Sequence, residues 1–451
     1  MLLKAFLMMF GAAFAVCIAV YLFSIYRQAF VFFPPIFFIT NLPIPGIGSP
    51  ERLFTSILLL IFVMLFGMRD QKGSIDLSVL MSFVLFVLAF APSISYSPIA
   101  PAKTLTSLIS RLSLVVFVFL VVKNIISRRQ INDCVFGISL LIILLGLFCL
   151  FAIAMTGSIN VLRESVEDAP FFRQGVFKLT VLNNPTYLSR IVLICLPFIF
   201  FAFARRPALP WRKYYLVIFV LCVLLLFATV SKLAFATFLL NVTILFFYFR
   251  KKERRFFRII FVVILIGGLA YGSTLAQRFS NLAGQYERKG TLLRVMLWHA
   301  AFEGFLENPF FGNGPGAESE LYQMERHGGV QYLTYVKQGT AIPRSPHNSY
   351  LSIALQGGLA AIATFFLFLA FYARSIYKRL KKARLYRDFF QDRYFELLFI
   401  CSLLSLMNLL IGCMFSGVIW MNLVWFILGL SLAGASVFEM DLARIRRSSQ
   451  P

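Results

Sequence analysis

The sequence predicts an all-α polytopic membrane protein of about twelve transmembrane helices, with a large loop on one side of the membrane. Of its 451 residues, 60% are hydrophobic and 16% aromatic, including 53 phenylalanines, a composition far outside that of soluble globular domains. The apolar runs have the length that an α-helix needs to cross a bilayer, and the alternating pattern of a membrane β-barrel is absent. The spans are therefore expected to be helices.

The first apolar run follows a single lysine, Lys4, and has no convincing small-residue cleavage site. We expect this run to be retained as a span rather than removed as a signal peptide. The hydropathy pattern places the twelve predicted spans at 5–25, 53–68, 75–92, 104–122, 132–156, 184–204, 214–230, 233–249, 258–276, 351–373, 394–414 and 417–436.

The lysines and arginines predict the orientation of these spans. If the N-terminus is cytoplasmic, most of the 43 basic residues fall on the cytoplasmic side, as the positive-inside rule requires. The main basic clusters on that side lie at 128–129, 204–213, 250–258, 373–388 and 444–447. Both termini are thus expected in the cytoplasm. Because the clusters adjoin spans, the net charge of +24 points to contact with anionic membrane lipid and not to nucleic acid.

Two long loops are expected on the outer side. Residues 1–276 would form nine spans with a smaller outer loop at 157–183, and residues 277–350 would form the large loop. Residues 351–451 would add three spans and a basic cytoplasmic C-terminus. Within the large loop, apolar residues recur at helical spacing from Leu292 to Phe305 and end at "ENPFFGNGPG", which predicts an amphipathic helix lying on the outer membrane face.

Several outer-side cations run against the orientation bias and indicate a negatively charged ligand. Arg190 lies about one and a half turns inside a predicted span, where an unpaired guanidinium is costly. Lys232 begins a span, and Arg294 lies on the inward-looking side of the amphipathic helix. Each of these charges could instead reach the interface or pair with a loop carboxylate. The nearest such carboxylates in sequence are Glu164, Glu167 and Asp168.

The segment "RSPHNSYL" (344–351) brings Arg344, His347 and Asn348 to the start of a span. The sequence predicts that His347 and Asn348 occupy its first turn, where a histidine is more often a capping or interfacial residue than a catalyst. Here, imidazole among cations could accept a proton while the cations hold a departing diphosphate. No outer-side carboxylate pair has metal-ligand spacing, so any catalysis is expected to need neither a metal nor a cofactor.

Four ordered fragments of this sequence resemble the O-antigen ligase and O-antigen polymerase superfamily. They are "NNPTYLSRIVLICLP" (183–197), "SKLAF" (231–235), "LLRVMLWHAAFEGFLENPFFGNGPG" (292–316) and "SPHNSYLSIALQGGLAAI" (345–362), and together they cover about a sixth of the chain. The second departs from the family pattern, because Lys232 stands where members usually carry an arginine. Lysine keeps the charge but loses the bidentate fork.

The resemblance implies a glycosyltransferase of the bacterial inner membrane whose active site faces the periplasm. Its donor would be an undecaprenyl-diphosphate-linked glycan. The acceptor would be the lipid A core oligosaccharide in a ligase of lipopolysaccharide biosynthesis, or a second lipid-linked glycan in a polysaccharide polymerase. His347 would assist the acceptor hydroxyl, Arg294, Lys232 and Arg190 would bind the diphosphate, and Asn348 and Arg344 would support them.

Two other classes of protein remain open. A transporter or flippase for an anionic lipid-linked substrate would predict paired broken helices at the membrane midplane and an internal repeat. In this sequence the polar residues gather on one face instead, and the large loop has no counterpart. A scaffolding membrane protein would have no need of the outer cations. Between ligase and polymerase the sequence favours the ligase only slightly.

Overall fold

The computed structural model describes residues 76–156, 185–205, 209–229, 231–250, 253–280, 285–329, 345–390 and 392–448. Every regular element in these ranges is a helix, so the all-α prediction is confirmed there. The elements in chain order are α4 (Leu77–Leu88), η2 (Pro92–Tyr96), α5 (Pro101–Asn124), α6 (Arg128–Thr156), α8 (Pro185–Arg205), α9 (Leu209–Thr229), α10 (Lys232–Phe249), α11 (Arg254–Ser280), α12 (Gln285–Glu307), α13 (Ala317–His327), α15 (Ser349–Leu385), α16 (Arg387–Phe390), α17 (Tyr394–Cys413), η6 (Val418–Trp420) and α18 (Asn422–Ser448).

Nine helical segments of the described residues are long and apolar enough to cross a membrane. They correspond to nine of the twelve predicted spans. The predicted spans 5–25 and 53–68 lie outside the described residues. The predicted span 258–276 falls on α11, which is not among the nine, because side chains are described only for its first part.

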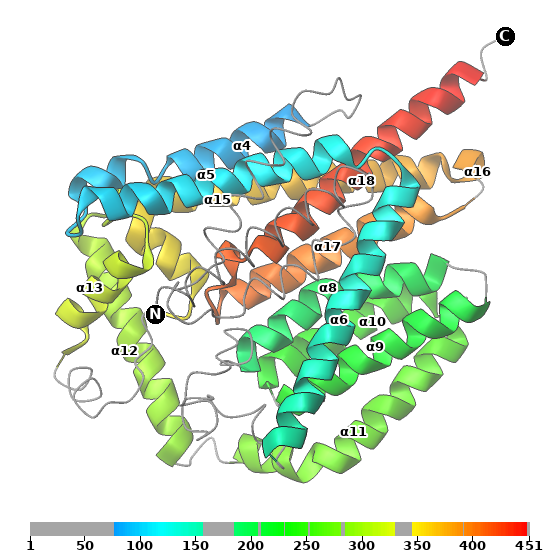
Figure 1. The fold of residues 1–451 in the computed structure, drawn as a ribbon, viewed down its shortest axis with the longest axis horizontal. Helices are drawn as coiled ribbons and strands as arrows, with labels where there is room; N and C mark the ends of the chain where they lie inside the picture. The colour runs from blue at the N-terminus through cyan, green and yellow to red at the C-terminus, as the bar shows by residue number, and fades with distance from the viewer. Residues whose placement is uncertain are drawn as a thin grey trace, which may run out of the picture.

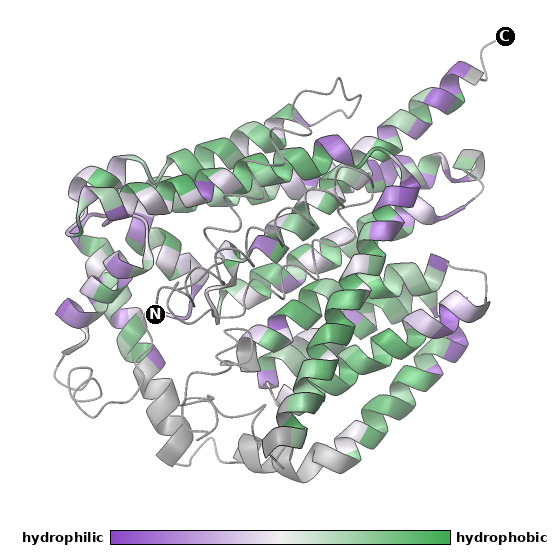
Figure 2. Cartoon of the chain, in the orientation of Figure 1, coloured by the Kyte–Doolittle hydropathy of each residue, from purple (hydrophilic) through white to green (hydrophobic). Residues whose placement is uncertain are grey.

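The core of the bundle lies between α8, α17 and α18. The most apolar windows of α8 and α18 are 89% buried, whereas that of α10 is 33% buried. Polar side chains tie the central helices together: Ser405 Oγ donates to Ile194 O at 2.8 Å, and Asn408 Nδ2 donates to Leu193 O at 2.6 Å. Figures 1 and 2 show the long apolar helices running side by side. A hydrogen bond in such surroundings fixes the register of two helices that apolar packing alone would leave free to slide.

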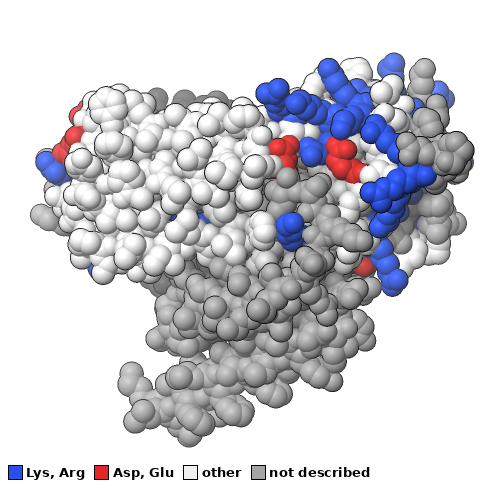
Figure 3. All heavy atoms as spheres, turned by 90° about the horizontal axis from the view of Figure 1, so that it is seen from above, with Lys and Arg blue, Asp and Glu red and all other residues white. Residues whose placement is uncertain are grey.

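Most lysines and arginines of the described residues gather at one end of the bundle, called the basic end here (Figure 3). Ion pairs join segments far apart in the sequence there. Arg128 contacts Asp392 at 2.9 Å and Asp441 at 2.8 Å, and Lys382 contacts Glu439 at 3.1 Å. The basic segments predicted to share one side of the membrane therefore lie together.

The opposite end, called the outer end here, carries α12 and α13. In Figure 1, α12 runs across the ends of the long helices, in agreement with a helix lying on the membrane face, and it ends at Glu307 where "ENPFFGNGPG" predicts a stop. Two details differ from prediction. The segment 317–327, expected as loop, forms α13, and α15 continues to Leu385 through residues expected to form a basic loop.

Candidate functional site

The start of α15 differs from the sequence prediction by one turn. Asn348 is the N-cap of the helix, and its Oδ1 accepts hydrogen bonds from Tyr350 N at 2.9 Å and Leu351 N at 3.1 Å. His347 therefore precedes the cap and does not lie in the first turn. Its backbone has φ of 49°, an uncommon conformation for a residue other than glycine. The irregular backbone turns the chain just before the helix, and His347 is partly buried there.

Helix α12 lies against this turn and holds it in place. Trp298 Nε1 donates a hydrogen bond to Pro346 O at 2.9 Å. Arg294, four residues earlier and so on the same face of α12, interacts electrostatically with His347. Its side chain is exposed, whereas the sequence predicts it on the inward-looking side of the helix. Burial, and then the positive charge of Arg294, lower the pKa of His347 below its ordinary value. Both effects favour the neutral imidazole, which is the form that can accept a proton.

Arg190 projects from α8 into the same region. Its side chain is 1% exposed, and it interacts electrostatically with Arg294 and with Cys413 at the end of α17. Among the described residues, its Nε and Nη1 atoms find no hydrogen-bond partner. A buried guanidinium without these hydrogen bonds lowers the stability of the fold unless a negatively charged group binds it. Arg294 thus interacts with both Arg190 and His347, and these three residues are called the cluster below. Their predicted roles stay a prediction.

Lys232 and Arg344 are two further predicted site residues. Lys232 is the first residue of α10, directly after the N-cap Ser231, and is partly exposed at the outer end. Arg344 lies outside the described residues, so its predicted supporting role stays a prediction.

Helix α15 and the segment that follows α12 cross and are joined through their backbones. Helix α15 is broken at Gly358, where φ is 65° and ψ is −162°. The break frees backbone groups that pair with the chain after α12. Leu359 N donates to Pro309 O at 2.7 Å, Ala360 N to Phe310 O at 3.1 Å, Asn313 N to Leu355 O at 2.9 Å and Gly314 N to Gln356 O at 3.1 Å. The backbone polar groups are therefore satisfied within the protein, as a broken helix at membrane depth requires.

The approach of these two segments explains the glycines in "GNGPG" and "QGG". A Cβ added to Gly358 would lie 2.4 Å from the backbone carbon of Phe310, and one added to Gly312 would lie 2.4 Å from that of Gln356. Both glycines also have positive φ, which disfavours any other residue. The sequence points to a turn after α12, but it does not reveal that the turn packs into the break in α15.

A polar cavity of about 280 Å³ adjoins the cluster. Ser345, two residues from His347, and Tyr187, less than one turn from Arg190, line it together with the buried residues Arg111 and Glu320. The remaining lining residues are Ser107, Ser110, Ser113, Leu114, Gly316, Ala317, Ser352, Gln356, Gly417, Trp420 and Asn422. The cavity therefore presents hydroxyls, amides, an aromatic ring and both signs of charge.

Arg111 and Glu320 are linked through Gln356. The guanidinium carbon of Arg111 lies 4.1 Å from the ring centroid of Phe90 and 3.9 Å from that of Trp420, an arrangement that favours a cation. Arg111 Nη2 donates to Gln356 Oε1. Arg111 is only 6% exposed and lies inside the bundle.

Glu320 is the carboxylate of this cavity. Its Oε1 accepts hydrogen bonds from Ser352 Oγ and Gln356 Nε2, and both described donors reach this one oxygen. Burial raises the pKa of Glu320 above its ordinary value, while these hydrogen bonds and Arg111 oppose the rise. The sequence does not reveal this contact, because 36 residues separate Glu320 from Gln356.

The fold and this site define an all-α polytopic membrane protein with buried cations and an imidazole gathered at one end. Residues 217–366 match the family model described as O-antigen ligase. This match supports the O-antigen ligase superfamily and confirms the resemblance predicted from the sequence fragments. The matched region runs from α9 into α15 and contains Lys232, Arg294 and His347, whereas Arg190 precedes it. No curated protein matches the chain.

Proposed function

We propose that the protein is a membrane-embedded glycosyltransferase that moves O-antigen glycan from undecaprenyl diphosphate to the lipid A core oligosaccharide on the periplasmic face. The observation that carries the proposal is the position of Arg294, which interacts with both Arg190 and His347. Cations suited to a diphosphate therefore lie beside a group suited to accept a proton. The family match agrees with a lipid-linked glycan as substrate.

In the proposed reaction, the acceptor hydroxyl oxygen forms a bond to the anomeric carbon of the donor sugar. The bond from that carbon to the diphosphate oxygen breaks, and undecaprenyl diphosphate leaves with the electron pair. His347 takes the hydroxyl proton, and Arg190, Arg294 and Lys232 bind the negative charge of the leaving group. Charge-assisted hydrogen bonds to phosphate oxygens are among the strongest in proteins, so no metal ion is required for this role.

Within this proposal, the polar cavity binds a sugar ring next to His347. Its volume of about 280 Å³ lies near the lower limit for small-molecule sites, which suits a single ring better than a long glycan. Glu320 and Gln356 would accept and donate hydrogen bonds to the ring hydroxyls, and the Trp420 ring would cover an apolar face. Glu320→Gln should therefore raise the KM for one of the two substrates. It should leave the binding of undecaprenyl diphosphate alone unchanged.

The polymerase reaction, with a second lipid-linked glycan as acceptor, uses the same chemistry and differs only in the acceptor. The transporter alternative predicts two broken helices. Among the helices that the structure describes, only α15 has non-helical backbone angles inside it, and its break is filled by a loop of the protein.

Transfer by purified protein tests the proposal. A lipid-linked O-antigen donor is supplied with either lipid A core or a second lipid-linked glycan, and products are separated by mass. Product on lipid A core supports the ligase, and a lengthened lipid-linked glycan supports the polymerase. Absence of both products, with transport of the donor across vesicles, would reject the enzyme and favour the transporter.

A further inference from the structure

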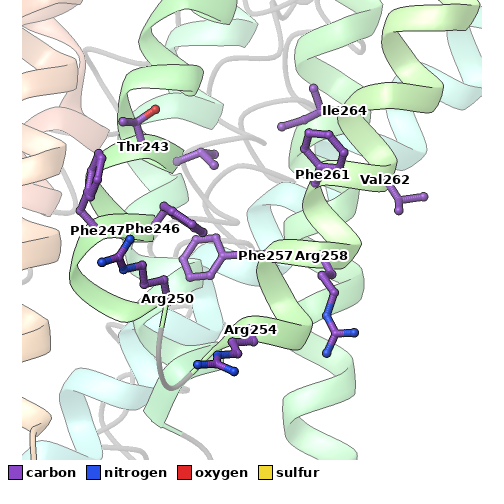
Figure 4. Close-up of a pocket in the computed structure, with 11 residues that line it drawn as sticks. Thr243, Phe246, Phe247, Arg250, Arg254, Phe257, Arg258, Phe261, Val262 and Ile264 are labelled. Atoms are coloured by element: carbon purple, nitrogen blue, oxygen red, sulfur yellow. The ribbon is translucent and has the colours of Figure 1, made fainter.

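A large apolar groove lies at the basic end of the molecule, far from the cluster around His347. It opens between α10 and α11 and has a volume of about 930 Å³. These helices are consecutive in the chain, yet α10 packs on α8 and α11 packs on α9, so a gap forms between them. Figure 4 shows the groove, with arginines at one end and apolar side chains above them.

The walls of the groove have the character of a surface that faces lipid. Phe247 is 68% exposed and Phe261 is 67% exposed. The least buried of the nine candidate spans is α10. The rings of Phe246 and Phe257 line the groove as well and meet edge to face at 5.3 Å. Such apolar exposure is unremarkable in a bilayer, but here it surrounds a concave space that an acyl chain can fill.

Three arginines stand at the rim: Arg250 caps the C-terminus of α10, and Arg254 and Arg258 lie in the first turns of α11. None of the ion pairs found among the described residues involves them. The neighbouring carboxylate, Glu253, is engaged by Arg212. The rim therefore carries a net positive charge, which a phosphate group would complement.

The length of the groove matches one leaflet of a membrane. From Val242 to its C-cap Arg250, the groove follows α10 over eight residue steps, or about 12 Å at 1.5 Å per residue. Half of the hydrocarbon core of a bilayer measures about 15 Å. A phospholipid with its phosphate at the arginines would thus place most of an acyl chain along the groove.

We propose that this groove binds an anionic phospholipid from the leaflet at the basic end of the protein. The phosphate and any further acidic group of the headgroup contact Arg250, Arg254 and Arg258, and an acyl chain lies between α10 and α11. Basic residues at the cytoplasmic ends of membrane helices attract anionic lipids in general. The groove adds an apolar site beneath the charges, so binding should be local and saturable.

Native mass spectrometry of the full-length protein, released from detergent with added lipid, tests this inference. Phosphatidylglycerol and phosphatidylcholine of identical acyl chains are compared, and we expect retention of phosphatidylglycerol at a defined stoichiometry. The triple variant Arg250→Gln, Arg254→Gln, Arg258→Gln should bind it about a hundredfold more weakly, since each basic residue near a phosphate contributes about a factor of five. Inorganic phosphate alone should not compete, because it cannot occupy the apolar groove.

A matched control removes the same charge elsewhere at the basic end. Arg374, Lys378 and Lys381 are exposed on α15 and line no part of the groove. Changing all three to Gln should leave phosphatidylglycerol binding within about twofold of the unaltered protein. Equal losses in the two triple variants, or no preference for phosphatidylglycerol in the unaltered protein, would overturn the inference.

A second variant tests the groove without altering any charge and covers the case in which the triple variant does not fold. Thr243 is exposed and lines the groove in Figure 4. Thr243→Trp should fill the acyl-chain position and lower phosphatidylglycerol retention at least tenfold, with all three arginines present. Unchanged retention in Thr243→Trp would show that the lipid contacts only surface charge and would reject the site.

Discussion

The two ends of this molecule use the same residue types in opposite ways. At the basic end, Arg128 and Lys382 are partly exposed and paired with carboxylates, and such surface pairs each contribute little to stability. At the outer end, Arg190 and Arg111 are almost fully buried, and the nearby backbone departs from helical geometry at His347 and Gly358. The end with fewer charges therefore carries the greater electrostatic cost. Such costs concentrate at functional sites.

Substitution of His347 is expected to have the largest effect at the outer end. His347→Ala should lower transfer by a factor of about 10² to 10⁴, the usual contribution of general-base catalysis. Donor binding, which depends on the cations, should change little. Measuring both quantities on purified His347→Ala and His347→Gln separates a base from a histidine that only shapes the turn. Near-normal turnover in either variant rules out the base, and parallel loss of donor binding would assign His347 to the diphosphate.

The cations proposed to bind the diphosphate come next in expected effect. Arg294→Ala and Lys232→Ala should each reduce transfer about ten- to a hundredfold, the cost of one charge-assisted contact, with normal amounts of protein in the membrane. Lys232→Arg should retain or improve activity because it restores a bidentate fork. Complementation of a strain that lacks the gene, scored by long-chain lipopolysaccharide, measures the outcome. Normal long chains from both alanine variants would contradict diphosphate binding.

Arg190→Met tests whether the buried Arg190 serves donor binding or the stability of the fold. Methionine keeps the volume of the side chain and removes a buried charge that lacks described partners at Nε and Nη1. Without donor, the thermal midpoint of the variant should equal or exceed that of the unaltered protein. With donor, the variant should lose about tenfold or more in affinity. A lowered midpoint without donor would show instead that Arg190 has a structural partner.

The sequence predicted the helices well because hydropathy over about twenty residues is a strong local signal. It also grouped Arg190, Arg294 and His347 on the outer side, and in the structure Arg294 interacts with the other two. Their roles in catalysis and binding stay a prediction. It could not predict the cavity, because Arg111 and Gln356 are 245 residues apart and their contact depends on the packing of α5 and α15 against α4 and η2. The break at Gly358 was hidden for a similar reason: its backbone partners come from the turn after α12.

The acidic limb of the pH profile should respond to Arg294. Burial and Arg294 both lower the pKa of His347, so the neutral base persists to lower pH than in a free histidine. Removing the charge in Arg294→Gln should raise that pKa, although not fully, because burial remains. The acidic limb of kcat/KM should move to higher pH by up to about one unit. Arg294→Lys keeps the charge and should leave the acidic limb in place. An unmoved limb in Arg294→Gln would show that the charge of Arg294 does not influence the pKa of His347.

The smallest expected effect is that of a chelator. Of the carboxylates that could form a missed metal site, the structure describes Glu318, which pairs with Lys103 at 2.9 Å, and Glu320, which bonds Ser352 and Gln356. Two residues apart on one helix, they point in different directions and do not converge on an ion. Because arginines and a lysine can bind the diphosphate charge, transfer by purified protein should survive EDTA within about twofold. Activity that disappears with EDTA and returns with Mg²⁺ or Mn²⁺ would instead place a metal at the outer end, with Glu164, Glu167 and Asp168, outside the described residues, as its first candidate ligands.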